Sequence, residues 1–174
     1  MLNGKEIEFA GHSERYSKEK NDPWINNDLI NAAIEGGAPD VIVLHEKAWA
    51  KRMRNLFAGN FRALLEPTQR QWIKKFYPQL AGIPIKDYWH HETHAGAGVL
   101  SSNFDECAVM VIDAIGEFDT ASIWHWKEGQ LKKIHSIKFP SSLGLFYSAI
   151  THHVGLKPME DEYILMGMAA YGDD

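Results

Sequence analysis

Three short strand-like segments follow one another in the second half of the sequence. They are rich in apolar and β-branched residues, span residues 107–113, 120–126 and 131–139, and are separated by short turns. Consecutive strands with tight turns between them predict an antiparallel meander, because each strand can pair with the one before it. Helix-like patterns over 143–153 and 160–171 come after the last strand. This half therefore combines a small antiparallel sheet with helices.

The first half alternates helix-like and strand-like segments. The segments are a hairpin turn at Asn3-Gly4, helices at 24–35, 46–57 and 67–77, and a buried strand at 40–44. A continuous apolar strand between two helices is typical of an α/β layer, and we therefore predict the α/β fold class. Since each half has a hairpin followed by helices, we interpret the two halves as a weak internal duplication. The opening strands of the first copy are absent in this interpretation.

The composition indicates a globular protein. Of the 174 residues, 45% are hydrophobic and 24% are charged, which excludes a disordered chain and allows one domain or two small lobes. The net charge of −5 disfavours a large DNA footprint, which needs many cationic side chains. No segment approaches the roughly 20 apolar residues of a membrane-spanning helix. The single cysteine cannot form an internal disulfide, so we expect a cytoplasmic protein with no membrane partner.

A cluster of histidines carries the densest chemistry in the sequence. In a helix, His90 and His94 lie on one face at the i, i+4 spacing that lets two imidazoles share a transition metal. A zincin motif starting at His91 would need a histidine where Ala95 stands, so a metallopeptidase is disfavoured. Two imidazoles are an incomplete site, and an Asp or Glu from elsewhere must complete it. The spacing alone also allows a solvated helix start that binds no metal.

Two turns could bind phosphate or serve only the fold. Asp113 ends a predicted strand and Gly116 follows it, a pattern that offers N–H groups to an anion and a carboxylate to a metal or water. An ordinary hairpin bend uses the same residues. Ser141 or Ser142 begins the predicted helix at 143–153, where a hydroxyl can cap the helix or help to bind an anion.

Taken in order, five segments of the sequence resemble the nodulation-protein type carbamoyltransferases. These segments are 13–18, 90–95, 111–120, 140–151 and 161–172. The resemblance covers nearly the whole chain but only the front part of the family's protein. It implies a two-lobed actin-like ATPase (ribonuclease H-like) architecture, incomplete at both ends. Residues 1–104 would be the first lobe, which lacks its opening strand and carries the histidine motif, and residues 105–174 the start of the second lobe, a β-meander followed by helices.

The resemblance also implies a function. The chain would be the metal-bearing part of an O-carbamoyltransferase, which moves a carbamoyl group from carbamoyl phosphate, through carbamoyladenylate made with ATP, to a hydroxyl of a small acceptor. A divalent metal, preferably iron with zinc or manganese as alternatives, would be held by His90 and His94. The family's third metal ligand is an Asp further downstream than this chain reaches. Among the remaining matched positions, the predicted catalytic residues are Asp113 and Glu117, and the predicted cofactor-binding residues are Gly116, Thr120, Ser142 and Gly144.

Three departures from the family pattern bear on activity. Ala114 replaces a usual Gly, Ile164 a usual Lys and Ala170 a usual Pro. The adenylate-forming domain is also missing, so we expect the chain to be inactive alone and to need a complementary protein segment or subunit. One alternative is a non-catalytic nucleotide-binding or regulatory module. Another is a relative of the tRNA threonylcarbamoyl transferase. The net charge of −5 disfavours this second alternative, because nucleic acid is an unlikely partner for a negatively charged chain.

Overall fold

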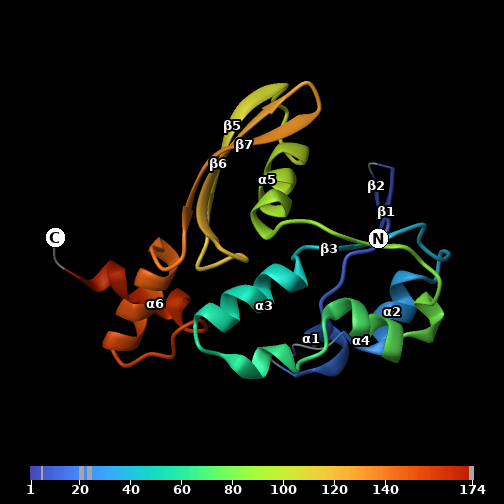
Figure 1. Cartoon of the computed structure of the whole chain (residues 1–174), viewed down its shortest axis with the longest axis horizontal. Coiled ribbons are helices and arrows are strands. Elements are labelled where there is room, and N and C mark those ends of the chain that lie inside the picture. The colour runs from blue at the N-terminus through green and yellow to red at the C-terminus, as the bar shows by residue number, and fades with distance from the viewer. Residues whose placement is uncertain (5, 20–21, 23–24, 173–174) are drawn as a thin grey trace. The chain divides into compact units, whose positions relative to one another are not determined.

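The chain has a mixed α/β structure. A computed structural model describes residues 1–4, 6–19, 22 and 25–172, and Figure 1 shows their helices and strands. The contacts divide the chain into two compact units, which we describe separately. The first unit comprises Met1–Leu44 and Glu66–Lys86, and the second comprises His45–Leu65 and Asp87–Asp174. This division differs from the predicted lobe boundary at residue 104, which stays a prediction.

The first unit holds short helices and two-stranded sheets. Its elements are β1 (Leu2–Asn3), β2 (Glu6–Ile7), α1 (Ser13–Ser17), α2 (Asn27–Ala33), β3 (Ile42–Leu44), α4 (Gln69–Phe76), η2 (Pro78–Leu80) and β4 (Ile85–Asp87, whose last residue belongs to the second unit). The predicted hairpin at Asn3-Gly4 is confirmed, because β1 pairs antiparallel with β2. The predicted helix at 24–35 forms as α2 from Asn27, whereas its first position, Trp24, lies outside the described residues.

The core of the first unit forms around α4. Thr68 begins this helix with a capping box, accepting from the Gln71 N–H at 3.2 Å, and the helix buries Ile73 against Tyr77 and Leu80. The predicted strand at 40–44 is present as β3, which pairs with β4. Its predicted burial is wrong, since Val43 is 55% exposed. A sheet of two strands leaves one face of each strand to solvent unless another layer covers it.

The second unit contains the predicted meander. Its elements are α3 (Ala48–Phe57), η1 (Phe61–Leu64), α5 (His90–Leu100), β5 (Glu106–Ile112), β6 (Asp119–Lys127), β7 (Gln130–Lys138), α6 (Leu143–His153), α7 (Glu162–Met168) and η3 (Ala169–Tyr171). The strands pair antiparallel in the order β5-β6-β7. The strand-and-helix pattern of the second half is therefore confirmed, as is the start of a helix at the histidine cluster.

Helix α5 packs against one face of this sheet (Figure 1). Ala95 on the helix is fully buried and contacts a cluster that includes Val111 and Trp124. Because strand side chains alternate between faces, Met110 points away from α5 and is 66% exposed. The small residues after the histidines let the helix approach the sheet closely, which brings the histidine-bearing end of α5 near the end of β5.

The C-terminal helices are linked by a carboxylate of α7. Glu162 Oε1 accepts hydrogen bonds from the Ser148 hydroxyl at 2.5 Å and from the Met159 N–H at 2.6 Å. The Ser148 hydrogen bond, followed by the backbone one, lowers the pKa of Glu162. The carboxylate thus ties the start of α7 to α6 and to the loop between the two helices. Within the described residues, no helix has the length and apolar character to cross a membrane.

The lowered pKa of Glu162 makes a testable contribution to acid sensitivity. A carboxylate with a lower pKa in the folded state stabilises the fold above its unfolded pKa, and this stabilisation is lost as the pH falls through the folded value. We expect Glu162→Gln to lower the free energy of unfolding at pH 7. At pH 3 the difference in free energy of unfolding between the variant and wild type should be smaller. Urea unfolding of both chains at the two pH values measures this. An equal gap at both pH values would contradict the assignment.

Candidate metal centre

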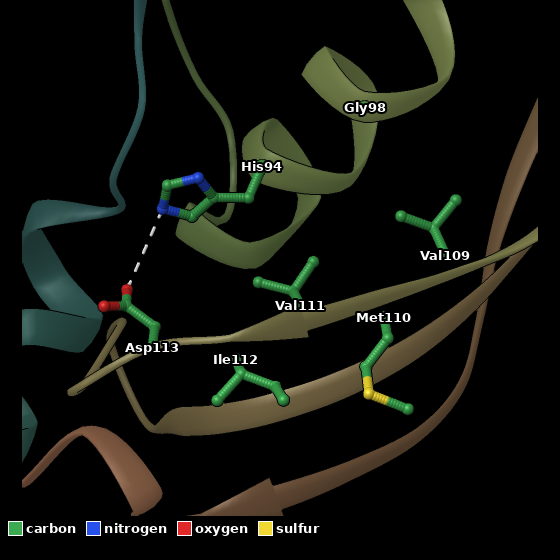
Figure 2. Close-up of a pocket in the computed structure, with 7 residues that line it drawn as sticks. All are labelled: His94, Gly98, Val109, Met110, Val111, Ile112 and Asp113. Carbon is green, nitrogen blue, oxygen red and sulfur yellow. Dashed lines mark ion pairs between the residues drawn. The ribbon is translucent and has the colours of Figure 1, made fainter. Parts of the chain in front are cut away.

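Three potential metal ligands from two elements of the second unit converge. His90 and His94 lie one turn apart on α5, and their Nε2 atoms are 3.0 Å from each other. Asp113 comes directly after β5, and its Oδ2 lies 2.8 Å from His90 Nε2 and 3.8 Å from His94 Nε2. Figure 2 shows His94 reaching from α5 toward Asp113. The structure therefore places the Asp113 carboxylate beside the predicted pair of imidazoles.

The spacing and chemistry of these three atoms fit a divalent metal. Two donors that each lie about 2.1 Å from one ion at angles of 90–110° are about 3.0–3.4 Å apart. The observed separations of 3.0, 2.8 and 3.8 Å bracket that range. Two imidazoles and a carboxylate suit iron, zinc or manganese, and the His94 side chain is 53% exposed. The group thus has the ligand set of a metal site, and one of its imidazoles is exposed to solvent.

Neighbouring groups hold the carboxylate and the His90 ring in place. Asp113 Oδ1 accepts the Ala114 N–H at 2.6 Å, so Oδ2 is the atom left for the imidazoles. The His45 ring packs against the His90 ring with 5.5 Å between their centroids. Groups that orient metal ligands in this way strengthen metal binding, because less freedom is lost when the ion enters.

The turn that follows Asp113 is tightly packed. A Cβ on Gly116 would lie 3.0 Å from His91 Cδ2 and 3.2 Å from His90 Cβ, so only glycine fits without a shift. The Arg54 guanidinium donates to the Gly116 carbonyl. Thr120 is 1% exposed, and its hydroxyl donates to the Ser141 carbonyl at 2.5 Å. The turn is therefore fixed to α5, α3 and the segment before α6.

The start of α6 packs against the same turn. The Ser142 hydroxyl donates to the Ala114 carbonyl at 2.7 Å and accepts from the Leu145 N–H at 3.0 Å, which confirms it as the cap. A Cβ on Gly144 would lie 2.6 Å from the Ala114 backbone nitrogen. Thus the four residues expected to bind a cofactor make these contacts around the Asp113 turn, and their nucleotide-binding role stays a prediction.

Comparison with known proteins identifies the family. Residues 9–174 match the family described as Carbamoyltransferase N-terminus. The chain belongs to the carbamoyltransferase family. An uncharacterized protein of Synechocystis sp. is 34% identical, covering 96% of this chain and 31% of the relative. The nodulation protein NolO of Bradyrhizobium diazoefficiens is 36% identical over 84 residues, covering 48% of this chain and 15% of the relative. An uncharacterized protein of Methanocaldococcus jannaschii is 27% identical, covering 100% of this chain and 31% of the relative. The chain therefore spans about a third or less of these curated relatives.

A pocket opens beside the candidate metal ligands (Figure 2). Its volume is about 290 Å³, and it is lined by His94, Gly98, Val109, Met110, Val111, Ile112 and Asp113. Two of the three candidate ligands, His94 and Asp113, thus lie in the wall of this pocket beside the apolar residues of β5. Sequence reasoning missed this pocket, because it arises only where α5 meets β5.

Sequence reasoning also missed the role of His91 in this carbamoyltransferase chain. His91 is 2% exposed, and its Nδ1 lies 2.7 Å from the Ser122 hydroxyl, which accepts from the Trp124 indole N–H at 2.8 Å. Burial lowers the pKa of His91, which favours the neutral imidazole. Among the described residues, its Nε2 has no hydrogen-bond partner. The signal in the sequence was the strand alternation, which places Ser122 and Trp124 on the same face of β6.

Removing the Ser122 hydroxyl should destabilise the second unit. Ser122→Ala leaves the buried His91 Nδ1 and Trp124 indole N–H without their shared partner. Leaving buried polar groups unsatisfied costs about 1–3 kcal/mol, and we expect a loss of that size in the free energy of unfolding. Urea unfolding measures it, with Ser101→Ala as an exposed control that should stay within about 0.5 kcal/mol of wild type. Equal stabilities of the two variants would contradict the network.

Proposed function

We propose that this chain is the metal-bearing part of an O-carbamoyltransferase. The observation that carries the proposal is the convergence of His90, His94 and Asp113 in a chain of the carbamoyltransferase family. The substrates would be carbamoyl phosphate and ATP, which together give carbamoyladenylate, and a small acceptor that bears a hydroxyl. The family resemblance makes iron the preferred metal. Zinc and manganese are alternatives, because imidazole and carboxylate ligands accept all three.

The chemistry assigns a task to each group. In the transfer, the bond from the carbamoyl carbon to the phosphate oxygen of the adenylate breaks, and AMP departs with the electron pair. The carbamoyl carbon bonds to the acceptor oxygen, whose hydroxyl proton is released to solvent. A bound divalent metal would polarise the carbonyl and neutralise phosphate charge. His90 and His94 would hold it with Asp113, whose Oδ1 stays bonded to the Ala114 N–H. The pocket beside His94 would receive the acceptor next to the metal ligands.

The rest of the architecture belongs to the same proposal. The two-lobed actin-like fold, with a division near residue 104, would need further segments to close around the nucleotide. Since the chain spans about a third or less of its curated relatives, we propose that a complementary segment or subunit supplies them. The isolated chain would then bind metal without turning over carbamoyl phosphate.

A domain-exchange experiment tests the proposal. The chain replaces the matching first part of a full-length carbamoyltransferase of this family, and the chimera is assayed for ATP-dependent transfer of labelled carbamoyl groups. We expect transfer by the chimera, its loss in the chimera carrying His90→Ala and His94→Ala, and no turnover by the isolated chain. Turnover by the isolated chain would contradict the need for a partner segment. Metal-independent ATP binding would instead favour a non-catalytic nucleotide-binding module.

A further inference from the structure

Two helices near the candidate metal ligands have N-cap side chains that cannot cap them, although in α5 the Glu92 carboxylate accepts the Trp89 N–H at 3.4 Å. Lys47 is the N-cap of α3 and Trp89 the N-cap of α5, and neither side chain makes a capping hydrogen bond. Lysine and tryptophan side chains only donate hydrogen bonds, so they cannot accept from the free N–H groups of a first turn. Those N–H groups need an acceptor from elsewhere, since an unsatisfied helix end is unfavourable when buried.

A single buried carboxylate meets this need at both helices. Glu117, in the turn between β5 and β6, is 4% exposed. Its Oε1 accepts the Lys47 N–H at 2.7 Å, and its two oxygens lie 3.2 and 3.1 Å from the His90 nitrogen. A negative charge is favourable at the positive end of a helix, and hydrogen bonds to a carboxylate are stronger than those to a neutral acceptor. Glu117 therefore ties together the starts of α3 and α5.

We infer that Glu117 is a positioning residue for the metal ligands. His90 is the shared point, because its N–H binds Glu117 while its Nε2 lies 2.8 Å from Asp113. Asp113 and Glu117 belong to one turn, whose Gly116 leaves room for the His90 Cβ. The carboxylate thus fixes α5 against the same turn that supplies the third ligand. With its oxygens held by backbone N–H groups and almost no exposed surface, Glu117 acts through His90 and not on substrate. This inference rests on the proposed metal site.

Cobalt titration of the full chain tests the inference. Co²⁺ alone is added to metal-free wild type and to Glu117→Gln, with circular dichroism to verify folding. The matched control is Glu162→Gln, which also removes a carboxylate that accepts a backbone N–H in the second unit. Loss of a group that orients metal ligands typically weakens metal binding about 10–100-fold, and we expect a loss of that size in Glu117→Gln with an altered visible spectrum at saturation. Glu162→Gln should keep the affinity and spectrum of wild type.

A second measurement tests, without any metal, whether Glu117 holds the starts of α3 and α5. Amide hydrogen exchange at Lys47 and His90 should accelerate in metal-free Glu117→Gln and stay unchanged in Glu162→Gln. If Glu117→Gln fails to fold, Glu117→Asp, which keeps the charge but shortens the side chain, replaces it in both measurements. Wild-type affinity and spectrum in the Glu117 variant, or unchanged exchange at both amides, would overturn the inference. Failure of wild type to bind Co²⁺ would overturn the proposed metal site itself. The exchange rates would still decide whether Glu117 holds the starts of α3 and α5.

Discussion

Replacing both His90 and His94 with alanine should abolish stoichiometric metal uptake by the chain. The double variant keeps only Asp113 of the three converging groups, and a lone, partly exposed carboxylate binds transition metals weakly. Both substitutions lie on a helix, where alanine is well tolerated, so the fold should persist. The measurement is metal content by mass spectrometry after anaerobic loading with Fe²⁺ and, separately, with Zn²⁺ or Mn²⁺. The metal that wild type retains best also identifies the preferred ion.

The matched control for this experiment is His125→Ala. His125 is also an imidazole of the second unit that lies close to a carboxylate, with its Nε2 2.8 Å from Glu106 Oε1. Glu106 lies on β5 and His125 on the neighbouring strand β6. Within the described part of the chain, this pair does not belong to a group of three potential metal ligands. His125→Ala should therefore keep the metal content of wild type. Undiminished metal in the His90 and His94 double variant would refute the proposed site.

The His90–His94 pair could be predicted because it depends only on helical periodicity. Any helix that begins at or before His90 places the two rings on one face, and α5 begins there. The position of Asp113 beside the two rings depends instead on packing, because the end of β5 lies near the rings only when α5 packs on the sheet. The sequence suggested a metal or water for Asp113 and expected the third ligand downstream. It could not show that the carboxylate already faces both imidazoles.

Residues that act through the fold were harder to predict than those with a motif. The match of the glycine turn to the family led us to expect a catalytic role for Glu117, which stays a prediction, and the structure shows its carboxylate facing the backbone of α3 and α5. Its partners are N–H groups, which every residue but proline has, so no side-chain pattern could reveal them. The burial of β3 was mispredicted for a related reason. An apolar run predicts a strand, but the number of layers that cover it is a property of the whole sheet.

Substituting Gly144 with alanine should damage both the fold and the metal site. The new Cβ would lie 2.6 Å from the Ala114 nitrogen and Cα, and 2.8 Å from the Asp113 carbonyl carbon. Backbone atoms cannot rotate away as a side chain can, so the start of α6 or the Asp113 turn must shift. Overpacking of this kind typically costs about 1–3 kcal/mol, and we expect that loss in the free energy of unfolding.

Gly96→Ala is the opposite case and serves as the control. Gly96 lies inside α5, close to the histidines in sequence, yet nothing lies within 4 Å of the position that a Cβ would take there, so alanine fits without a clash. Alanine at a helix interior should raise the free energy of unfolding by about 0.5–1 kcal/mol. Urea unfolding and Co²⁺ titration of both variants separate the effects. We expect Gly144→Ala to lose stability and Co²⁺ affinity together, because the turn it displaces carries Asp113. A Gly144→Ala chain as stable as wild type would show that α6 does not set the position of Asp113.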